Sequence, residues 1–195
     1  GESSLIPEGF EFRPTRIAID SHGFIYVVSD GSYYGALLYD SNFNLIGFYG
    51  SNTVKATAGS VISNIANRMF PNNTKKGNTV RRLPYCFNDI FIDGDDFVYT
   101  CNGYTEKYSR SGQIRKLSPG SGNNIYGSDD RNFVDEKTNE SYADGAMAKQ
   151  NLMSVRVDKN GFVYALESAY GRVFMYDKSG RVMTAFGGGM GHGAQ

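Results

Sequence analysis

The sequence predicts an all-β protein made of three four-stranded antiparallel sheets, and three observations support this prediction. Short apolar runs alternate with turn signals from Val155 to Gly187, as in an antiparallel meander. The same unit occurs twice more upstream, beginning at Ile17 and at Ile90. The 195 residues include 14 Tyr, 13 Phe and 24 Gly, and aromatic residues favour strands while glycine favours tight turns.

Two sequence positions keep the three copies in register. The second strand of each copy opens with Phe, an aliphatic residue and Tyr, at residues 24–26, 97–99 and 162–164. The first strand of each copy ends at an aspartate, namely Asp20, Asp93 or Asp158. A residue that recurs at equivalent strand ends has a repeated structural task. We therefore expect the aspartates to accept backbone N–H groups in the turns, rather than to act in catalysis.

The domain organisation follows from these copies. We expect a first sheet at about 12–50, a helical insertion at 51–83, a second sheet at about 84–118, a loop insertion at 119–150, a third sheet at about 151–187 and a flexible tail at 188–195. In the second copy, Thr105 to Tyr108 is predicted as the third strand and Gln113 to Leu117 as the fourth. Residues 5–16 are expected to precede the first strand.

The two insertions differ in character. Apolar residues recur at i, i+4, i+7, i+8, i+11 and i+15 from Val54 to Met69, which predicts one inserted helix over Thr53–Phe70 that Pro71 ends. Residues 119–150 are rich in Gly, Ser, Asn and Asp and are predicted to form a long loop. Both insertions connect the fourth strand of one copy to the first strand of the next.

The position of these insertions predicts where a ligand binds. In a meander, the fourth-to-first connections and the second-to-third connections emerge at the same edge, and loop-rich edges of rigid β scaffolds usually carry binding sites. Tyrosine offers a flat apolar ring with a hydrogen-bonding tip, which suits sugars or peptides. The candidate ligand-binding residues at this edge are Tyr33, Tyr34, Asn102, Tyr104, Glu167 and Tyr170, with Arg13, Arg16 and Asn88 before the first strands. The alternative, that the rings pack beneath the insertions, stays open.

Composition excludes several classes of protein. Twenty basic and twenty acidic residues leave no net charge, so we expect no nucleic-acid partner. No run of about 18 apolar residues is present, so we expect no membrane span in this chain. Cys86 and Cys101 do not form a metal-binding pattern. We expect both cysteines to be free, half-buried thiols, and a disulfide across two neighbouring strands is the alternative.

Three segments carry a resemblance to a known family. Residues 17–30 (IAIDSHGFIYVVSD), 90–102 (IFIDGDDFVYTCN) and 155–168 (VRVDKNGFVYALES) resemble repeats of NHL-type β-propellers. The resemblance implies that each sheet is a propeller blade, and that the chain is a partial propeller of three blades. Such propellers usually close with about six blades. Either a longer chain supplies the remaining blades, which we favour, or a second copy completes the ring.

A looser resemblance concerns the first copy and its helical insertion. Residues 26–50 (YVVSDGSYYGALLYDSNFNLIGFYG) are similar to extracytoplasmic propeller proteins of Gram-positive bacteria. This similarity implies an extracytoplasmic or cell-envelope location.

We therefore expect a non-enzymatic binding module whose propeller blades present a loop-rich face to a protein or glycan ligand. Gluconolactonase-like propellers hold a divalent metal, so a fragment of a metal-dependent propeller hydrolase or lyase is the first alternative. The second is a structural platform that docks another domain through the inserted helix. We expect no catalytic residues, no cofactor and no metal, because the only histidines, His22 and His192, are poorly placed to bind zinc or to activate a nucleophile.

Overall fold

The computed structural model describes residue 6 and residues 9–32, 34–50, 86–103, 113–119, 124–125, 151–169 and 171–188. These residues form three antiparallel sheets and contain no helix, so the predicted all-β class is confirmed. The predicted helix Thr53–Phe70 and most of both insertions lie outside the described residues, as does the tail after Gly188.

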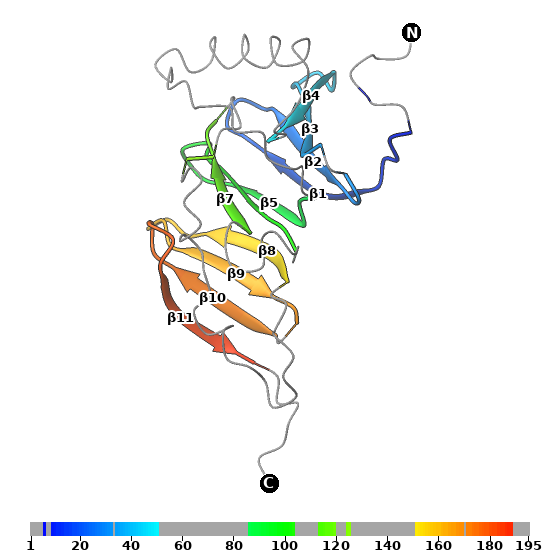
Figure 1. Ribbon diagram of the computed structural model, residues 1–195. Helices are drawn as coiled ribbons and strands as arrows, with labels where there is room; N and C mark the ends of the chain where they lie inside the picture. Colours follow the sequence, from blue (N-terminus) through cyan, green and yellow to red (C-terminus); the bar gives the residue numbers. More distant parts are fainter. Residues whose placement is uncertain are drawn as a thin grey trace.

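The sheets follow one another along the chain as sheets A, B and C (Figure 1). Sheet A contains β1 (Pro14–Ile19), β2 (Ile25–Ser29), β3 (Ala36–Tyr39) and β4 (Leu45–Tyr49). Sheet B contains β5 (Asp89–Ile92), β6 (Val98–Cys101) and β7 (Ile114–Leu117). Sheet C contains β8 (Leu152–Val157), β9 (Val163–Glu167), β10 (Arg172–Tyr176) and β11 (Val182–Gly187). Each sheet is a meander in chain order, and the first strands β1, β5 and β8 lie next to one another.

Sheet B corrects one prediction. The fourth strand expected at Gln113 to Leu117 is β7, and β7 pairs directly with β6, from Val98 opposite Leu117 to Cys101 opposite Ile114. It therefore takes the third position, which we had assigned to Thr105–Tyr108. The physical reason is burial: Ile114 and Leu117 fill the core, whereas the sequence Thr-Glu-Lys-Tyr has no aliphatic side chain to place there.

The end of sheet B also differs from the prediction. Beside β7, Leu117 forms an isolated antiparallel bridge with Asn124, and the N–H of Ile125 donates to the carbonyl of Lys116. Residues that we placed in the loop insertion thus occupy the position of a fourth strand. Another boundary shifts in sheet A, where β1 begins at Pro14 because an edge strand tolerates proline at its first residue.

Two apolar cores lie between consecutive sheets. The core between A and B combines Tyr26, Val28, Leu38 and Tyr49 with Ile90, Val98 and Leu117. The core between B and C combines Tyr99, Cys101 and Ile114 with Val155, Val163, Ala165 and Phe174. Successive residues of a strand point to opposite faces of its sheet, so β6 places Val98 in the first core and Tyr99 in the second. Sheet B is therefore buried on both faces.

A buried carboxylate joins the first strands of all three sheets. Asp89 in β5 accepts hydrogen bonds from the Ser154 hydroxyl (2.6 Å) and the Val155 N–H (3.1 Å) of β8. It also pairs with Arg156 Nη1 at 2.7 Å and, on the opposite side, with Arg16 Nε of β1 at 3.5 Å. Burial of a charge is tolerated only when such partners surround it.

One turn design recurs at five strand connections. The aspartate Oδ1 accepts the N–H groups of the second and fourth following residues at 2.8 to 3.0 Å, and the third following residue has a positive φ. The predicted turn role of Asp20, Asp93 and Asp158 is therefore confirmed. Asp40 and Asp177 do the same between the third and fourth strands of sheets A and C.

Replacement of Asp89 by alanine is expected to lower the free energy of unfolding by about 3 kcal/mol. The Ser154 hydroxyl and the Val155 N–H lose their acceptor, and an unsatisfied buried donor costs ~1–3 kcal/mol. Urea denaturation followed by circular dichroism measures the change. The control is Asp95→Ala, an exposed carboxylate expected to change stability by less than about 0.5 kcal/mol. Equal losses in both variants would contradict the role of Asp89.

The Asp177 turn gives a prediction about pH. Hydrogen bonds from the Ser179 hydroxyl and from the Arg181 N–H lower the pKa of Asp177 below its ordinary value. A lowered pKa contributes stability above the ordinary carboxyl pKa, and this contribution is lost as the pH falls through the folded-state value. Ser179→Ala is expected to move the Asp177 pKa upward, as carboxyl NMR titration would show. The lowered pKa of Asp40, held by Asn44, should stay unchanged in that variant.

Candidate functional site

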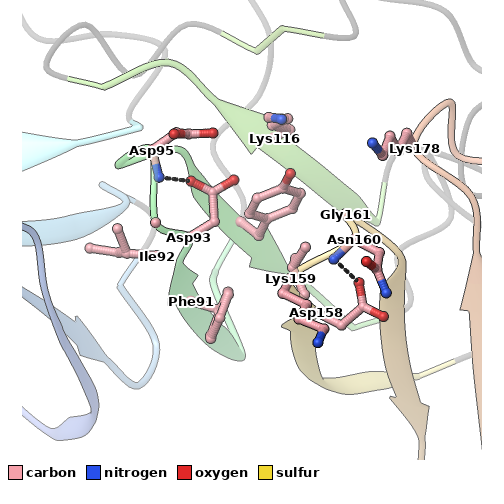
Figure 2. Close-up of a pocket in the computed structure, with 13 residues that line it drawn as sticks. Phe91, Ile92, Asp93, Asp95, Lys116, Asp158, Lys159, Asn160, Gly161 and Lys178 are labelled. Atoms are coloured by element: carbon pink, nitrogen blue, oxygen red, sulfur yellow. Dashed lines mark hydrogen bonds between the residues drawn. The ribbon is translucent and has the colours of Figure 1, made fainter.

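A pocket with a volume of about 600 Å³ lies between sheets B and C (Figure 2). We call it the intersheet pocket. Its walls are the turn after β5, with Asp93, and the equivalent turn after β8, with Asp158. Phe91 and Tyr99 also line it. The pocket therefore opens at the edge where first strands turn into second strands, opposite the edge at which we predicted binding.

Charged side chains of both signs line the intersheet pocket. Its acidic residues are Asp93, Asp95 and Asp158, and its basic residues are Lys116, Lys159 and Lys178. Figure 2 shows Asp93 and Asp95 on one side, with Asp158 and Lys159 across from them. The Oδ1 atoms of Asp93 and Asp158 are held by backbone N–H groups of their own turns, which fixes the positions of both carboxylates.

Aromatic rings hold one of the lysines in place. The Lys116 ammonium lies 4.2 Å from the centroid of the Phe97 ring and 5.3 Å from that of Tyr99. This is the geometry of a cation–π contact. The lysine is thereby presented at the pocket wall from β7, a rigid element. Among the described residues, no group of three or more His, Cys, Asp or Glu side chains is arranged to hold a metal ion.

A smaller pocket of about 260 Å³ lies beside the start of β1, on the predicted edge. We call it the Phe10 pocket. Arg13 and Tyr34, two of the predicted ligand-binding residues, line it together with Phe10 and Ser32. The Tyr34 ring packs against Phe10 and against Phe48, with centroid separations of 6.5 and 5.3 Å.

The other predicted site residues that the structure describes make contacts within the fold. Glu167 is buried, where it accepts the Ala169 N–H at 2.7 Å and pairs with Arg172 at 3.3 Å. Asn102 is also buried, and its Oδ1 accepts a hydrogen bond from Arg115 at 2.6 Å.

Two further predicted residues connect neighbouring sheets. Asn88 donates to the Leu152 carbonyl at 2.7 Å, and Arg16 pairs with Asp89. Tyr33, Tyr104 and Tyr170 lie outside the described residues. Among the described members of the predicted set, Arg13 and Tyr34 thus line one pocket, and Asn88 lies opposite Asn102 where β5 and β6 pair.

The intersheet pocket was not anticipated, although the sequence carried one signal for it. Lys159 and Lys178 each follow directly after a turn aspartate, Asp158 and Asp177. Because the aspartate fixes the turn, the next side chain projects from a defined position. Lys116 comes from a strand of sheet B and lines the same pocket as these two lysines of sheet C. No spacing in the sequence predicts this proximity, because it results from the packing of the two sheets.

The two cysteines are not joined by a disulfide. Cys86 is half-buried, and Cys101 is fully buried in the core between sheets B and C. Burial raises the pKa of the Cys101 thiol, and the nearby Asp89 carboxylate raises it further. A thiol with a raised pKa is a poor nucleophile at neutral pH, so Cys101 has a packing role.

Comparison with known proteins gives no family assignment. No family model matches the chain, and no curated protein matches it. Among solved structures, the chain is similar to PorZ from Porphyromonas gingivalis, described as an essential bacterial surface component of the type-IX secretion system. The TM-score is 0.37 and the identity 12%, over 95% of this chain and 29% of that chain. The chain therefore spans less than a third of that protein, and the resemblance to NHL repeats stays a prediction.

The described part of the chain has no helix with the length and apolar character needed to cross a bilayer.

The cysteine environments predict different reactivities. Cys86 is expected to react with a water-soluble disulfide reagent in the native protein at pH 8, and Cys101 only after unfolding in urea, because Cys101 is buried and its pKa is raised. Titration of thiols with and without urea measures this difference. A Cys86→Ser variant assigns the signals, since its native form should give no rapid reaction. Rapid modification of Cys101 in folded protein would disprove this description of the core.

Proposed function

We propose that this protein is a non-enzymatic binding module, and that the intersheet pocket receives an extended segment of a partner polypeptide. The observation that supports this proposal is the pocket itself: about 600 Å³ between two rigid sheets, lined by three lysines and three aspartates. Concave sites with a few fixed polar groups are the usual form of binding sites. Opposite charges at fixed positions select the charge pattern and register of a bound segment.

The side chains at the pocket favour binding over catalysis. Its described lining contains no histidine, cysteine or serine. A serine or cysteine nucleophile needs an adjacent base, and the described lining offers no such pair. Asp93 and Asp158 instead use one oxygen each to hold their turns. The arrangement therefore supports recognition by charge.

The aromatic residues favour a polypeptide over a glycan. A sugar ring needs an accessible aromatic face to stack on. Tyr99 is buried, with the Lys116 ammonium near its ring, and the Arg156 guanidinium lies 5.7 Å from the centroid of the Phe91 ring. These ring faces are engaged within the protein. The charged groups of both signs suit the side chains of a peptide.

The same proposal includes the architecture and the location. We infer that sheets A, B and C are adjacent blades of a β-propeller, spanning about 12–50, 84–125 and 151–187, with β1, β5 and β8 nearest the axis. The meander order and the face-to-face packing of consecutive sheets support this arrangement. The extracytoplasmic or cell-envelope location rests on the sequence resemblance.

A second candidate site is the Phe10 pocket. It is favoured by one observation, that Arg13 and Tyr34 of the predicted edge meet there. A guanidinium beside a tyrosine ring suits a carboxylate or an aromatic side chain. The two sites lie on different sheets, so variants distinguish them.

The test selects peptides from a random phage-displayed library on the wild-type protein and measures their affinity for two variants. Lys116→Gln combined with Lys159→Gln is expected to weaken binding about tenfold, since two partly exposed charge contacts contribute ~0.5–1 kcal/mol each. The matched control Arg13→Gln should bind as the wild type does. Amide NMR signals of Gly94 and Gly161 should shift on binding.

Other outcomes of this experiment are equally decisive. Loss of binding in Arg13→Gln alone would move the site to the Phe10 pocket. Selection of no peptide, or peptides insensitive to both variants, would overturn the proposal for a polypeptide ligand.

A further inference from the structure

The contact between sheets A and B and the contact between sheets B and C are built alike. We call them junction A–B and junction B–C. Tyr26 and Ile90 belong to the core of junction A–B, and the residues at the same repeat positions, Tyr99 and Val155, belong to the core of junction B–C. The turn after each first strand is held by its aspartate in the same way. Equivalent turn residues can therefore be compared directly between the two junctions.

At junction A–B, a carboxylate joins the two turns. Asp96, the third residue after the turn aspartate of sheet B, accepts a hydrogen bond from the Ser21 N–H at 2.8 Å and from the Ser21 hydroxyl at 2.5 Å. His22 Nδ1 lies 3.3 Å from the same carboxylate. The φ of Asp96 is 62°, a left-handed conformation that favours glycine. An aspartate at this position therefore has a backbone cost, which its contact with sheet A offsets.

At junction B–C, both members of this pair are glycines. Gly94 stands at the repeat position of Ser21, Gly161 stands at that of Asp96, and both glycines line the intersheet pocket. A Cβ at Gly94 would meet no atom within 4 Å, so the space beside it is open. Within the part of the chain that the structure describes, the Gly94 N–H has no hydrogen-bond acceptor. By its repeat position, it is the donor that a carboxylate engages at junction A–B.

Lysine side chains surround the place of the missing acid. A Cβ at Gly161 would lie 3.0 Å from Lys178 Cε, so the end of Lys178 lies where an aspartate side chain would begin. Lys116 and Lys159 line the same pocket (Figure 2). The place that holds a carboxylate at junction A–B is therefore bordered by ammonium groups at junction B–C. Ammonium and N–H donors together favour an anion.

The acidic residues of the pocket leave this place open to an anion. Asp93 and Asp158 each direct one oxygen to backbone N–H groups of their own turns, which offsets part of their charge. Figure 2 shows Asp95 on the side opposite Lys178. The Lys178 side of the pocket therefore suits an acidic group.

We propose that the intersheet pocket binds a carboxylate of the partner polypeptide, in the place that Asp96 takes at junction A–B. The Gly94 N–H donates to this carboxylate, and the Lys178 ammonium pairs with it. This inference rests on the proposed function, that the pocket receives a polypeptide segment. The carboxylate belongs either to an acidic side chain or to the C-terminus of the partner, and the experiment distinguishes these two sources.

The probes are three synthetic pentaglycine peptides with acetylated N-termini. One has a glutamate as its middle residue and an amidated C-terminus, one has a free C-terminal carboxylate, and one is amidated and carries no acid. In an amide NMR titration of the wild-type protein, at least one acidic peptide is expected to shift the Gly94 signal. Its dissociation constant should be at least about tenfold lower than that of the neutral peptide. The acidic peptide that binds identifies the source of the carboxylate.

Gly161→Asp places the carboxylate in the protein itself, as Asp96 does at junction A–B. Its affinity for the acidic peptide is expected to fall at least about tenfold. The matched control is Gly23→Asp, because Gly23 has the same turn position in sheet A, a φ of 80° against 81° for Gly161, and no place in the pocket. This control should bind as the wild type does. Circular dichroism checks the folding of both variants, and Lys178→Gln, expected to weaken binding about threefold, tests the site without a change at a glycine.

Several results would overturn this inference: no shift of Gly94 with either acidic peptide, equal affinity for the neutral peptide, or Gly161→Asp binding as the wild type does. Library peptides that need Lys116 and Lys159 but no carboxylate would also overturn it, and would leave the proposed function intact. Acidic peptides that shift Gly94 while the library yields no ligand would support the carboxylate site and count against the polypeptide proposal alone.

Discussion

The Asp89 carboxylate is the constraint on which the arrangement of the sheets depends. A buried charge requires hydrogen-bond donors, and its donors come from strands more than sixty residues away in the chain. Arg16 approaches from one neighbouring sheet while Ser154 and Arg156 approach from the other. The apolar cores alone would permit sliding between sheet faces, since hydrophobic contact has no preferred direction. The directional contacts of Asp89 fix the register of the first strands.

Repeated turns and variable side chains together produce the candidate site. Asp93 and Asp158 hold turns of the same shape in sheets B and C, and the packing of the two sheets brings these turns to either side of one pocket. Because the backbone of each turn is held by its aspartate, the side chains that follow directly after it are not needed to shape the turn. These positions are occupied by charged residues such as Asp95 and Lys159, which give the pocket its character. The proposed binding surface thus arises from the packing of two repeats whose turns have the same shape.

The same repeat explains why the ends of the molecule differ from its middle. Sheet B has a neighbour on both faces, so Val98 and Tyr99 are both buried although they point in opposite directions. In sheets A and C one face lacks such a neighbour within the described chain, and equivalent apolar residues are exposed there. The apolar pattern of the repeat suits a sheet with neighbours on both faces. In sheets A and C the same pattern therefore leaves apolar side chains exposed on one face.

The sequence by itself determined the strands, their meander order in sheets A and C, and the turn role of the aspartates, because these depend on residues only a few positions apart. Tertiary structure decided the rest. Gln113 to Leu117 took the third position of sheet B because that position needed buried aliphatic side chains. Glu167 and Asn102, which we predicted to bind a ligand, are buried in the structure. Glu167 pairs with Arg172, and Asn102 accepts a hydrogen bond from Arg115. The edge of the sheets at which the pocket lies depends on the packing of sheet B on sheet C. This packing places Lys116 at the same pocket as the Asp93 and Asp158 turns.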